Sequence, residues 1–268
     1  MKLTHTKGKQ PAIGVFDSGI GGVSVLHEIR QLMPSVNLIY VADSAWLPYG
    51  NKPESVIRKR AELICDFLIK QGASIIVVAC NTATASAVAH LREKFHVPIV
   101  GMEPAIKPAA HYTNSGVVAV LATENTTKSH RLASLKDRFA HDIELLVQPC
   151  HGLVELVEAN KLNTPETVAM LEGYIKPLLD AKADVLILGC THYPFLKPAI
   201  QSVAGEEVTI LDTGLAIARH VKRQMQSLNL QHEHEAHEYF YCTGNAEIAS
   251  MLLANLWLHE RSFVMLAI

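Results

Sequence analysis

Two similar stretches, GASIIVVACNT at residues 72–82 and ADVLILGCTH at residues 183–192, decide the fold. Each is a short apolar run that ends in a cysteine, Cys80 in the first and Cys190 in the second. Runs of this length, with turn residues before them and polar residues after them, are typical of strands buried in a parallel sheet. Both continue into a helical segment and a further short strand, so we interpret them as matching parts of a duplicated α/β unit.

Short apolar runs alternate with helical segments on either side of these stretches, which is the pattern of parallel sheets covered by helices. The expected strands are residues 13–16, 37–41, 75–79 and 97–100 in one unit and 117–121, 143–147, 185–188 and 208–211 in the other. The sequence therefore predicts an α/β protein of two similar doubly wound, Rossmann-like domains with the active site in the cleft between them. We expect the tail to return to the first domain. The predicted domains are residues 1–104 plus 215–268, and residues 105–214.

Composition excludes several classes of protein. The chain has 268 residues, of which 49% are hydrophobic and 19% charged, as in globular α/β proteins. A formal charge of −2 gives no sign of the basic surface that nucleic-acid binding requires. No apolar run approaches the roughly 18 residues of a membrane span. The start, Met1 to Gln10, lacks an apolar signal segment, and five cysteines without a CxxC pair argue against a disulfide framework. We expect a cytoplasmic protein that binds neither nucleic acid nor membrane.

Chemistry in such folds is expected at the carboxyl ends of the strands, where Asp17, Cys80 and Cys190 lie. Each cysteine precedes small polar residues and an expected helix, and helix N-termini bind carboxylates and lower the pKa of a neighbouring thiol. We therefore expect both thiols to have lowered pKa values. A single free cysteine is more often a small buried hydrophobe, but two in matched positions favour a functional pair.

The other three cysteines lack that setting, and we assign them to packing: Cys65, Cys150 and Cys242. The histidines of the tract HEHEAHE are spaced for neither a helix face nor a strand face, so no metal site is expected at His232, His234 and His237.

The glycine-rich turn DSGIGG at residues 17–22 is neither a dinucleotide fingerprint nor a Walker loop. It could cradle a phosphate, but we favour close approach of backbone to a small anionic ligand, with Asp17 facing the site or capping a helix. His192 lies two residues after Cys190, near enough to act as its acid–base partner. Glu155 and Glu158 share a face if their segment is helical, and one of them could enter the cleft.

Four motifs taken together, GVFDSGIGG (14–22), AD (42–43) with PYG (48–50), ACNTA (79–83) and LGCTHYP (188–194), resemble the aspartate/glutamate racemase family in order and over most of the chain. The resemblance implies a racemase without cofactor or metal, in which Cys80 and Cys190 are the paired acid and base. Asp17 and His192 would be the polar groups that support the thiols. Glu158, rather than Glu155, would be a further carboxylate of the active site. The implied substrate cradle is Asp17, Ser18, Tyr49, Gly50, Asn81, Thr82, Thr191 and His192. The chain has Cys150-His151 where the family commonly has Cys-Pro.

Inverting an α-carbon without a cofactor requires one group that removes a proton and a second that returns one from the opposite face. The resemblance implies that Cys80 deprotonates D-glutamate and Cys190 L-glutamate. It also implies a role in bacterial peptidoglycan synthesis, a homodimer and, in some members, a cell-wall precursor as activator. Two alternatives stay open at this point: a racemase for aspartate or another acidic compound, and a small-anion binding module with structural cysteines.

Overall fold

The computed structural model of the chain describes residues 11–230, 236–257 and 261–268. Met1 to Gln10, His232 and His234, about which the sequence made predictions, lie outside these residues. In the described part of the chain, no helix is both long and apolar enough to cross a membrane.

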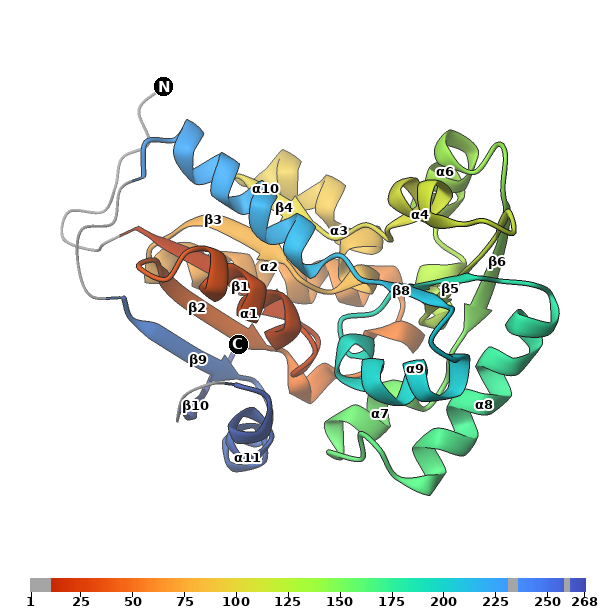
Figure 1. The fold of residues 1–268 in the computed structure, drawn as a ribbon. Coiled ribbons are helices and arrows are strands. Elements are labelled where there is room, and N and C mark those ends of the chain that lie inside the picture. The colour runs from red at the N-terminus through yellow and green to blue at the C-terminus, as the bar shows by residue number, and fades with distance from the viewer. Residues whose placement is uncertain (1–10, 231–235, 258–260) are drawn as a thin grey trace.

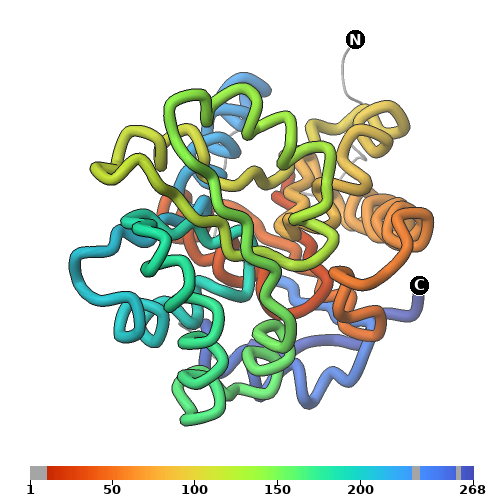
Figure 2. Tube along the Cα trace, turned by 90° about the vertical axis from the view of Figure 1, so that its right-hand side faces the viewer, coloured from red at the N-terminus to blue at the C-terminus, as the bar shows by residue number. Residues whose placement is uncertain are grey.

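Two parallel sheets organise the molecule, as the sequence predicts. The first has the order β10-β9-β2-β1-β3-β4 and the second the order β6-β5-β7-β8. The strands of the first sheet are β1 (Ala12–Asp17), β2 (Asn37–Ala42), β3 (Ala73–Val78), β4 (Ile99–Gly101), β9 (Glu238–Cys242) and β10 (Phe263–Met265). Those of the second are β5 (Val117–Ala122), β6 (Glu144–Pro149), β7 (Val185–Leu188) and β8 (Thr209–Leu211). The two units lie side by side in Figure 1, and the second lies in front of the first in the view of Figure 2.

Helices cover these sheets. Those of the first unit and the tail are α1 (Val23–Leu32), α2 (Glu54–Gln71), α3 (Asn81–Lys94), α10 (Gly214–Ser227) and α11 (Ala246–Leu256). The others are α4 (Ile106–Tyr112), α5 (Glu124–Thr127), α6 (His130–Phe139), α7 (Leu153–Glu158), α8 (Pro165–Asp180) and α9 (Lys197–Ala204). Three short 3-10 turns are η1 (Ser44–Trp46), η2 (Tyr49–Asn51) and η3 (Tyr193–Leu196). α2 ends where expected, because Gly72 takes the left-handed conformation (φ 103°) that closes a helix.

The two units repeat one topology. The order β2-β1-β3-β4 in the first sheet corresponds to β6-β5-β7-β8 in the second. Phe16 is the register partner of Val78, and Leu121 is the partner of Leu188. Val78 and Leu188 therefore hold equivalent places, and each precedes its cysteine by two residues. This is the arrangement that a duplicated unit requires.

Three local features differ from the expectations. The short helix α5, which was not expected, begins two residues after β5 ends. The 3-10 turn η3 follows Cys190 before α9 begins, so this cysteine does not precede an α-helix directly. β10 was not expected; it pairs with β9, which itself pairs with β2. The tail thus extends the first sheet, while the domain limits at residues 104/105 and 214/215 stay a prediction.

Candidate active site

Two buried thiols stand at equivalent strand ends. Cys80 follows β3 as the N-cap of α3, and its Sγ accepts a hydrogen bond from the Ala83 N–H at 3.4 Å. Cys190 follows β7 in the other sheet. Their exposed fractions are only 5% and 7%. The two thiols lie near enough that negative charge on Cys190 raises the pKa of Cys80.

The environment of Cys80 favours its protonated form, contrary to the expectation of a lowered pKa. Burial raises the pKa of the Cys80 thiol well above its ordinary value, and the charge of Asp17 raises it further. The hydrogen bond from Ala83 opposes this shift but does not outweigh it. Cys80 Sγ lies 3.9 Å from the Ser18 Oγ, to which the thiol can donate. The helix start alone therefore does not make this cysteine a thiolate.

Cys190 has a different partner. His192 Nδ1 lies 3.8 Å from its Sγ, and His192 Nε2 lies 2.7 Å from Glu158 Oε1. Burial by itself lowers the pKa of His192, but hydrogen bonds to Cys190 and Glu158 raise that pKa well above its ordinary value. A charged imidazole has two donors, so it can bind the carboxylate through one nitrogen and the sulfur through the other. Cys190 and Glu158 are therefore joined through the His192 ring.

The glycine-rich turn accommodates side chains from the second unit. The Ile20 N–H donates to Glu158 Oε1 at 2.8 Å. A Cβ at Gly19 would collide with that carboxylate, and a Cβ at Gly21 would collide with the His192 ring. The turn thus binds the carboxylate of Glu158 through the Ile20 N–H, while its approach to an external anionic ligand stays a prediction.

Asp17 is held beneath this turn. Its Oδ2 accepts from the Gly22 N–H at 2.8 Å and from the Thr191 hydroxyl at 3.2 Å. Among the residues that the structure describes, the buried Asp17 Oδ1 has no hydrogen-bond partner, and neither has either polar atom of the Asn81 side chain. Buried polar atoms are nearly always satisfied, so these atoms are available to a ligand.

A third group of side chains supports the loop that carries Tyr49 and Gly50. The Tyr49 hydroxyl donates to Asp43 Oδ2 at 2.5 Å. Arg60 binds the same carboxylate through both ends of its guanidinium, with Nη2–Oδ1 at 2.7 Å and Nε–Oδ2 at 3.0 Å. Burial and the charge of Asp43 raise the pKa of Tyr49, so this phenol stays protonated. The sequence motifs contained Asp43 but gave no reason to pair it with Arg60.

Residues of α5 reach the same region from the second unit, and sequence reasoning missed them. Thr82 Oγ1 lies 2.8 Å from Thr123 Oγ1 and 3.2 Å from Thr126 Oγ1. Asn125 donates to the carbonyls of Tyr49 and Lys52. The repeat offered a signal for one of them, because Thr123 follows β5 as Ser18 follows β1.

The remaining candidates lie elsewhere. Cys65 and Cys242 are fully buried in apolar clusters. Cys150 also packs in the core; burial raises its pKa to about 12, and its Sγ lies 3.5 Å from the Gln148 carbonyl. α7 does begin three residues after Cys150, a helix start that we did not expect there. Glu155 on α7 is exposed, in contrast to Glu158. Within residues 11–230, 236–257 and 261–268, no group of three His, Cys, Asp or Glu side chains could hold a metal ion.

Known proteins share this sequence and fold. The family model for Asp/Glu/Hydantoin racemases matches residues 13–221. A glutamate racemase of Ectopseudomonas mendocina is 56% identical over 225 residues, covering 84% of each chain. The crystal structure of a glutamate racemase isoform from Bacillus anthracis matches with a TM-score of 0.86 at 28% identity, covering 97% of this chain and 98% of that one.

A third match is the Escherichia coli glutamate racemase in complex with L-glutamate and the activator UDP-MurNAc-Ala. Its TM-score is 0.82 at 34% identity, covering 96% of this chain and 97% of that one. The family model spans well over half of the chain, and the relatives match over nearly their whole length. The chain therefore belongs to the Asp/Glu/Hydantoin racemase family.

Proposed function

We propose that the chain is a glutamate racemase that needs no cofactor and interconverts L- and D-glutamate through Cys80 and Cys190. The observation that carries this proposal is the pair of buried thiols at equivalent strand ends of two similar units. The similarity to glutamate racemases over most of the chain favours glutamate over aspartate or another acidic compound.

Each thiol serves one face of the α-carbon. Cys80 removes the α-proton of D-glutamate while Cys190 returns a proton from the other side, and the roles reverse for L-glutamate. His192 contacts the Cys190 sulfur through Nδ1 and is held in place by Glu158 through Nε2. Exclusion of water around the buried thiols strengthens the fixed dipoles that stabilise the carbanionic transition state.

The buried polar atoms that have no hydrogen-bond partner among the described residues indicate where the substrate binds. Asp17 Oδ1 and Asn81 Oδ1 can accept hydrogen bonds from the substrate ammonium group, and Asn81 Nδ2 can donate one to a substrate carboxylate. Ser18, Thr82 and Thr191 place hydroxyls around the same strand ends, and Tyr49 and Gly50 provide backbone. These assignments give the substrate charged or polar partners at both ends.

Cys80 holds its proton in the ligand-free protein, because burial and the charge of Asp17 raise the pKa of its thiol. The protonated Cys80 is the acid that the reaction of L-glutamate needs. Turnover of D-glutamate needs the proton on the other thiol, which binding of the substrate ammonium beside Asp17 would favour by neutralising that charge.

The direct test is racemisation by the purified protein without added pyridoxal phosphate or metal. Either glutamate isomer should approach a 1:1 mixture, followed by chiral chromatography, and aspartate should react far more slowly. Cys80→Ser and Cys190→Ser should each lower kcat by about 10³-fold, which is the scale of a lost acid or base. Full turnover in either single variant would refute the two-thiol scheme. Glutamate binding without turnover in the wild type would favour the binding-module alternative.

A glutamate racemase of this kind supplies D-glutamate for peptidoglycan synthesis, which places the reaction in the cytoplasm. A homodimer is part of the same proposal, and sedimentation of the purified protein tests it.

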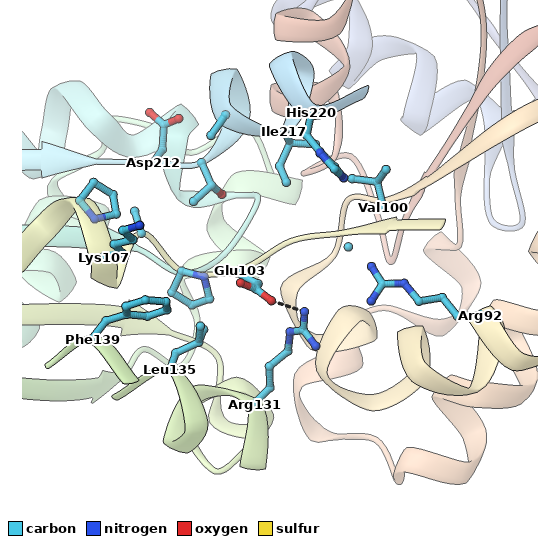
Figure 3. Close-up of a pocket in the computed structure, with 16 residues that line it drawn as sticks. Arg92, Val100, Glu103, Lys107, Arg131, Leu135, Phe139, Asp212, Ile217 and His220 are labelled. Atoms are coloured by element: carbon cyan, nitrogen blue, oxygen red, sulfur yellow. Dashed lines mark hydrogen bonds and ion pairs between the residues drawn. The ribbon is translucent and has the colours of Figure 1, made fainter. Parts of the chain in front are cut away.

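We also propose that a cell-wall precursor activates the enzyme at a second cavity, shown in Figure 3. This cavity has a volume of about 430 Å³ and lies where the chain crosses between the two sheets, after β4 and again after β8. Arg92, Lys107 and Arg131 line it, against the carboxylates Glu103 and Asp212. The E. coli relative is described with the activator UDP-MurNAc-Ala, whose diphosphate would complement these cations.

The two arginines of this cavity repel each other. Burial lowers the pKa of Arg92, and the neighbouring Arg131 lowers it further. Arg92 donates Nε and Nη2 to the Ile99 carbonyl, while Arg131 pairs with Glu103. A bound diphosphate would relieve the repulsion between the two guanidinium groups. It would also contact both segments that connect the two units, one after β4 and one after β8.

The test compares racemisation with and without UDP-MurNAc-Ala. Arg92→Ala should abolish activation and leave the basal rate unchanged, whereas Arg58→Ala, an exposed arginine paired with Glu54, should be activated like the wild type. Equal activation of Arg92→Ala and the wild type would contradict the placement, and no activation of the wild type would contradict the activator itself.

A further inference from the structure

The Tyr49–Lys52 turn is bound from across the boundary between the two units. The Asn125 amide, carried by α5, donates to the Tyr49 carbonyl at 3.1 Å and to the Lys52 carbonyl at 2.9 Å. A primary amide has two hydrogens, so this geometry uses both of them on one turn. The turn closes on itself as well, because the Lys52 N–H donates to the Tyr49 carbonyl at 3.1 Å.

The packing around this bridge is close. A Cβ at Gly50 would lie 3.0 Å from the Thr123 Cβ, so only a glycine lets the turn approach α5 without displacement. A second polar bridge runs alongside it, from Thr82 near the start of α3 to Thr123 and Thr126. Both bridges border the Cys80 side of the candidate site.

The other side of the turn is anchored within the first unit. The Tyr49 hydroxyl donates to the buried Asp43. Asn125 therefore ties the Tyr49–Gly50 backbone, which is anchored in the first unit, to the second unit.

Both thiols are nearly inaccessible in this structure. Access of a substrate to them requires the units to separate, and separation breaks the part-buried hydrogen bonds from Asn125 to the Tyr49–Lys52 turn. We propose that Asn125 is a positioning residue that closes the substrate cleft by binding the Tyr49 and Lys52 carbonyls across the two units. The kinetic part of this proposal rests on the proposed racemase function.

The effect of removing the Asn125 side chain on cleft closure can be predicted from the two hydrogen bonds that are lost. Two neutral hydrogen bonds of ordinary strength correspond to a factor of roughly ten to thirty in a closing equilibrium. Enantiomers have equal free energies, so the equilibrium constant of racemisation is one and kcat/KM must fall equally in both directions. We expect Asn125→Ala to raise KM for both isomers about tenfold with a smaller change in kcat. Asn125→Asp should be worse than Asn125→Ala, because it sets a carboxylate against two carbonyl oxygens.

Thr127→Ala is the matched control. It lies on the same short helix, and its hydroxyl donates only to the Glu124 carbonyl at 2.7 Å among the bonds described. If Asn125 acts merely by stabilising α5, the two alanine variants should behave alike. Closure predicts that Thr127→Ala keeps the wild-type KM.

Amide hydrogen exchange tests the bridge without any assay of activity. In Asn125→Ala, exchange within residues 49–53 should be about tenfold faster than in the wild type, while exchange in β5 stays unchanged. Faster exchange with an inactive wild type would uphold the bridge and refute the racemase proposal. An unchanged KM and unchanged exchange in Asn125→Ala would overturn the bridge, whatever the activity.

Discussion

The buried ion pair between Asp43 and Arg60 supports the Tyr49 loop, and its loss should have a measurable cost. Asp43 is fully buried and Arg60 is 5% exposed. Besides its two bonds to Asp43, Arg60 donates to the Ile268 carbonyl at 2.8 Å. Thr243 also donates to the carboxylate, at 2.8 Å. Arg60→Met would leave a buried charge with only neutral partners.

Removing one partner of a buried ion pair costs about 3–5 kcal/mol. For a chain of this length, each kcal/mol changes Tm by about 2 °C, so Arg60→Met should lower Tm by about 6–10 °C. Urea denaturation followed by circular dichroism measures the free energy directly. Arg58→Met, at an exposed pair with Glu54, should cost less than about 1 kcal/mol.

The double variant Asp43→Asn/Arg60→Met separates the charge from the packing. It removes the uncompensated carboxylate, so it should be more stable than Arg60→Met alone. A loss below about 1 kcal/mol in Arg60→Met, or a double variant as unstable as the sum of both single variants, would refute this reasoning.

Three further predictions concern Glu158, His192 and Cys80. Glu158→Gln should lower kcat about 10²-fold with both isomers, measured by circular dichroism, because His192 then loses the partner that keeps it charged. Folding raises the pKa of His192, so the stabilisation from its protonation is fully present below about pH 6.5 and is lost as the pH rises through the folded pKa. The difference in urea midpoint between the wild type and His192→Asn should therefore shrink as the pH rises from about 6.5 through the folded pKa. Because the pKa of Cys80 is raised, the tautomer with a Cys80 thiolate and a Cys190 thiol is disfavoured at every pH, so kcat for D-glutamate should be lower than kcat for L-glutamate while the two kcat/KM profiles superpose.

Local patterns in the sequence were sufficient for much of the fold. Buried parallel strands are continuous apolar runs, so β3 and β7 could be recognised together with the cysteines that follow them. The end of α2 could be placed because Gly72 is the residue that a left-handed cap favours. β10 escaped notice, since only three residues form it and its pairing with β9 depends on tertiary contacts.

The site was harder to predict, since its energetics depend on contacts between distant residues. Motif resemblance indicated Glu158, but its bonds to Ile20 and His192 join segments far apart in the chain. The raised pKa of Cys80 could not be foreseen, because burial is a property of the folded state and it outweighs the helix start. Asn125 carried no motif at all.

The two-base mechanism is tested most directly by the early fate of the α-proton in D2O. Incubated with L-glutamate, the enzyme should form D-glutamate that carries deuterium, while the remaining L-glutamate keeps its protium; the reverse should hold from D-glutamate. This result follows because one thiol removes the proton and the other, exchanged with solvent, delivers a deuteron. Product that retains the substrate's protium, or substrate that gains deuterium as fast as product forms, would contradict the assignment of Cys80 and Cys190 to opposite faces.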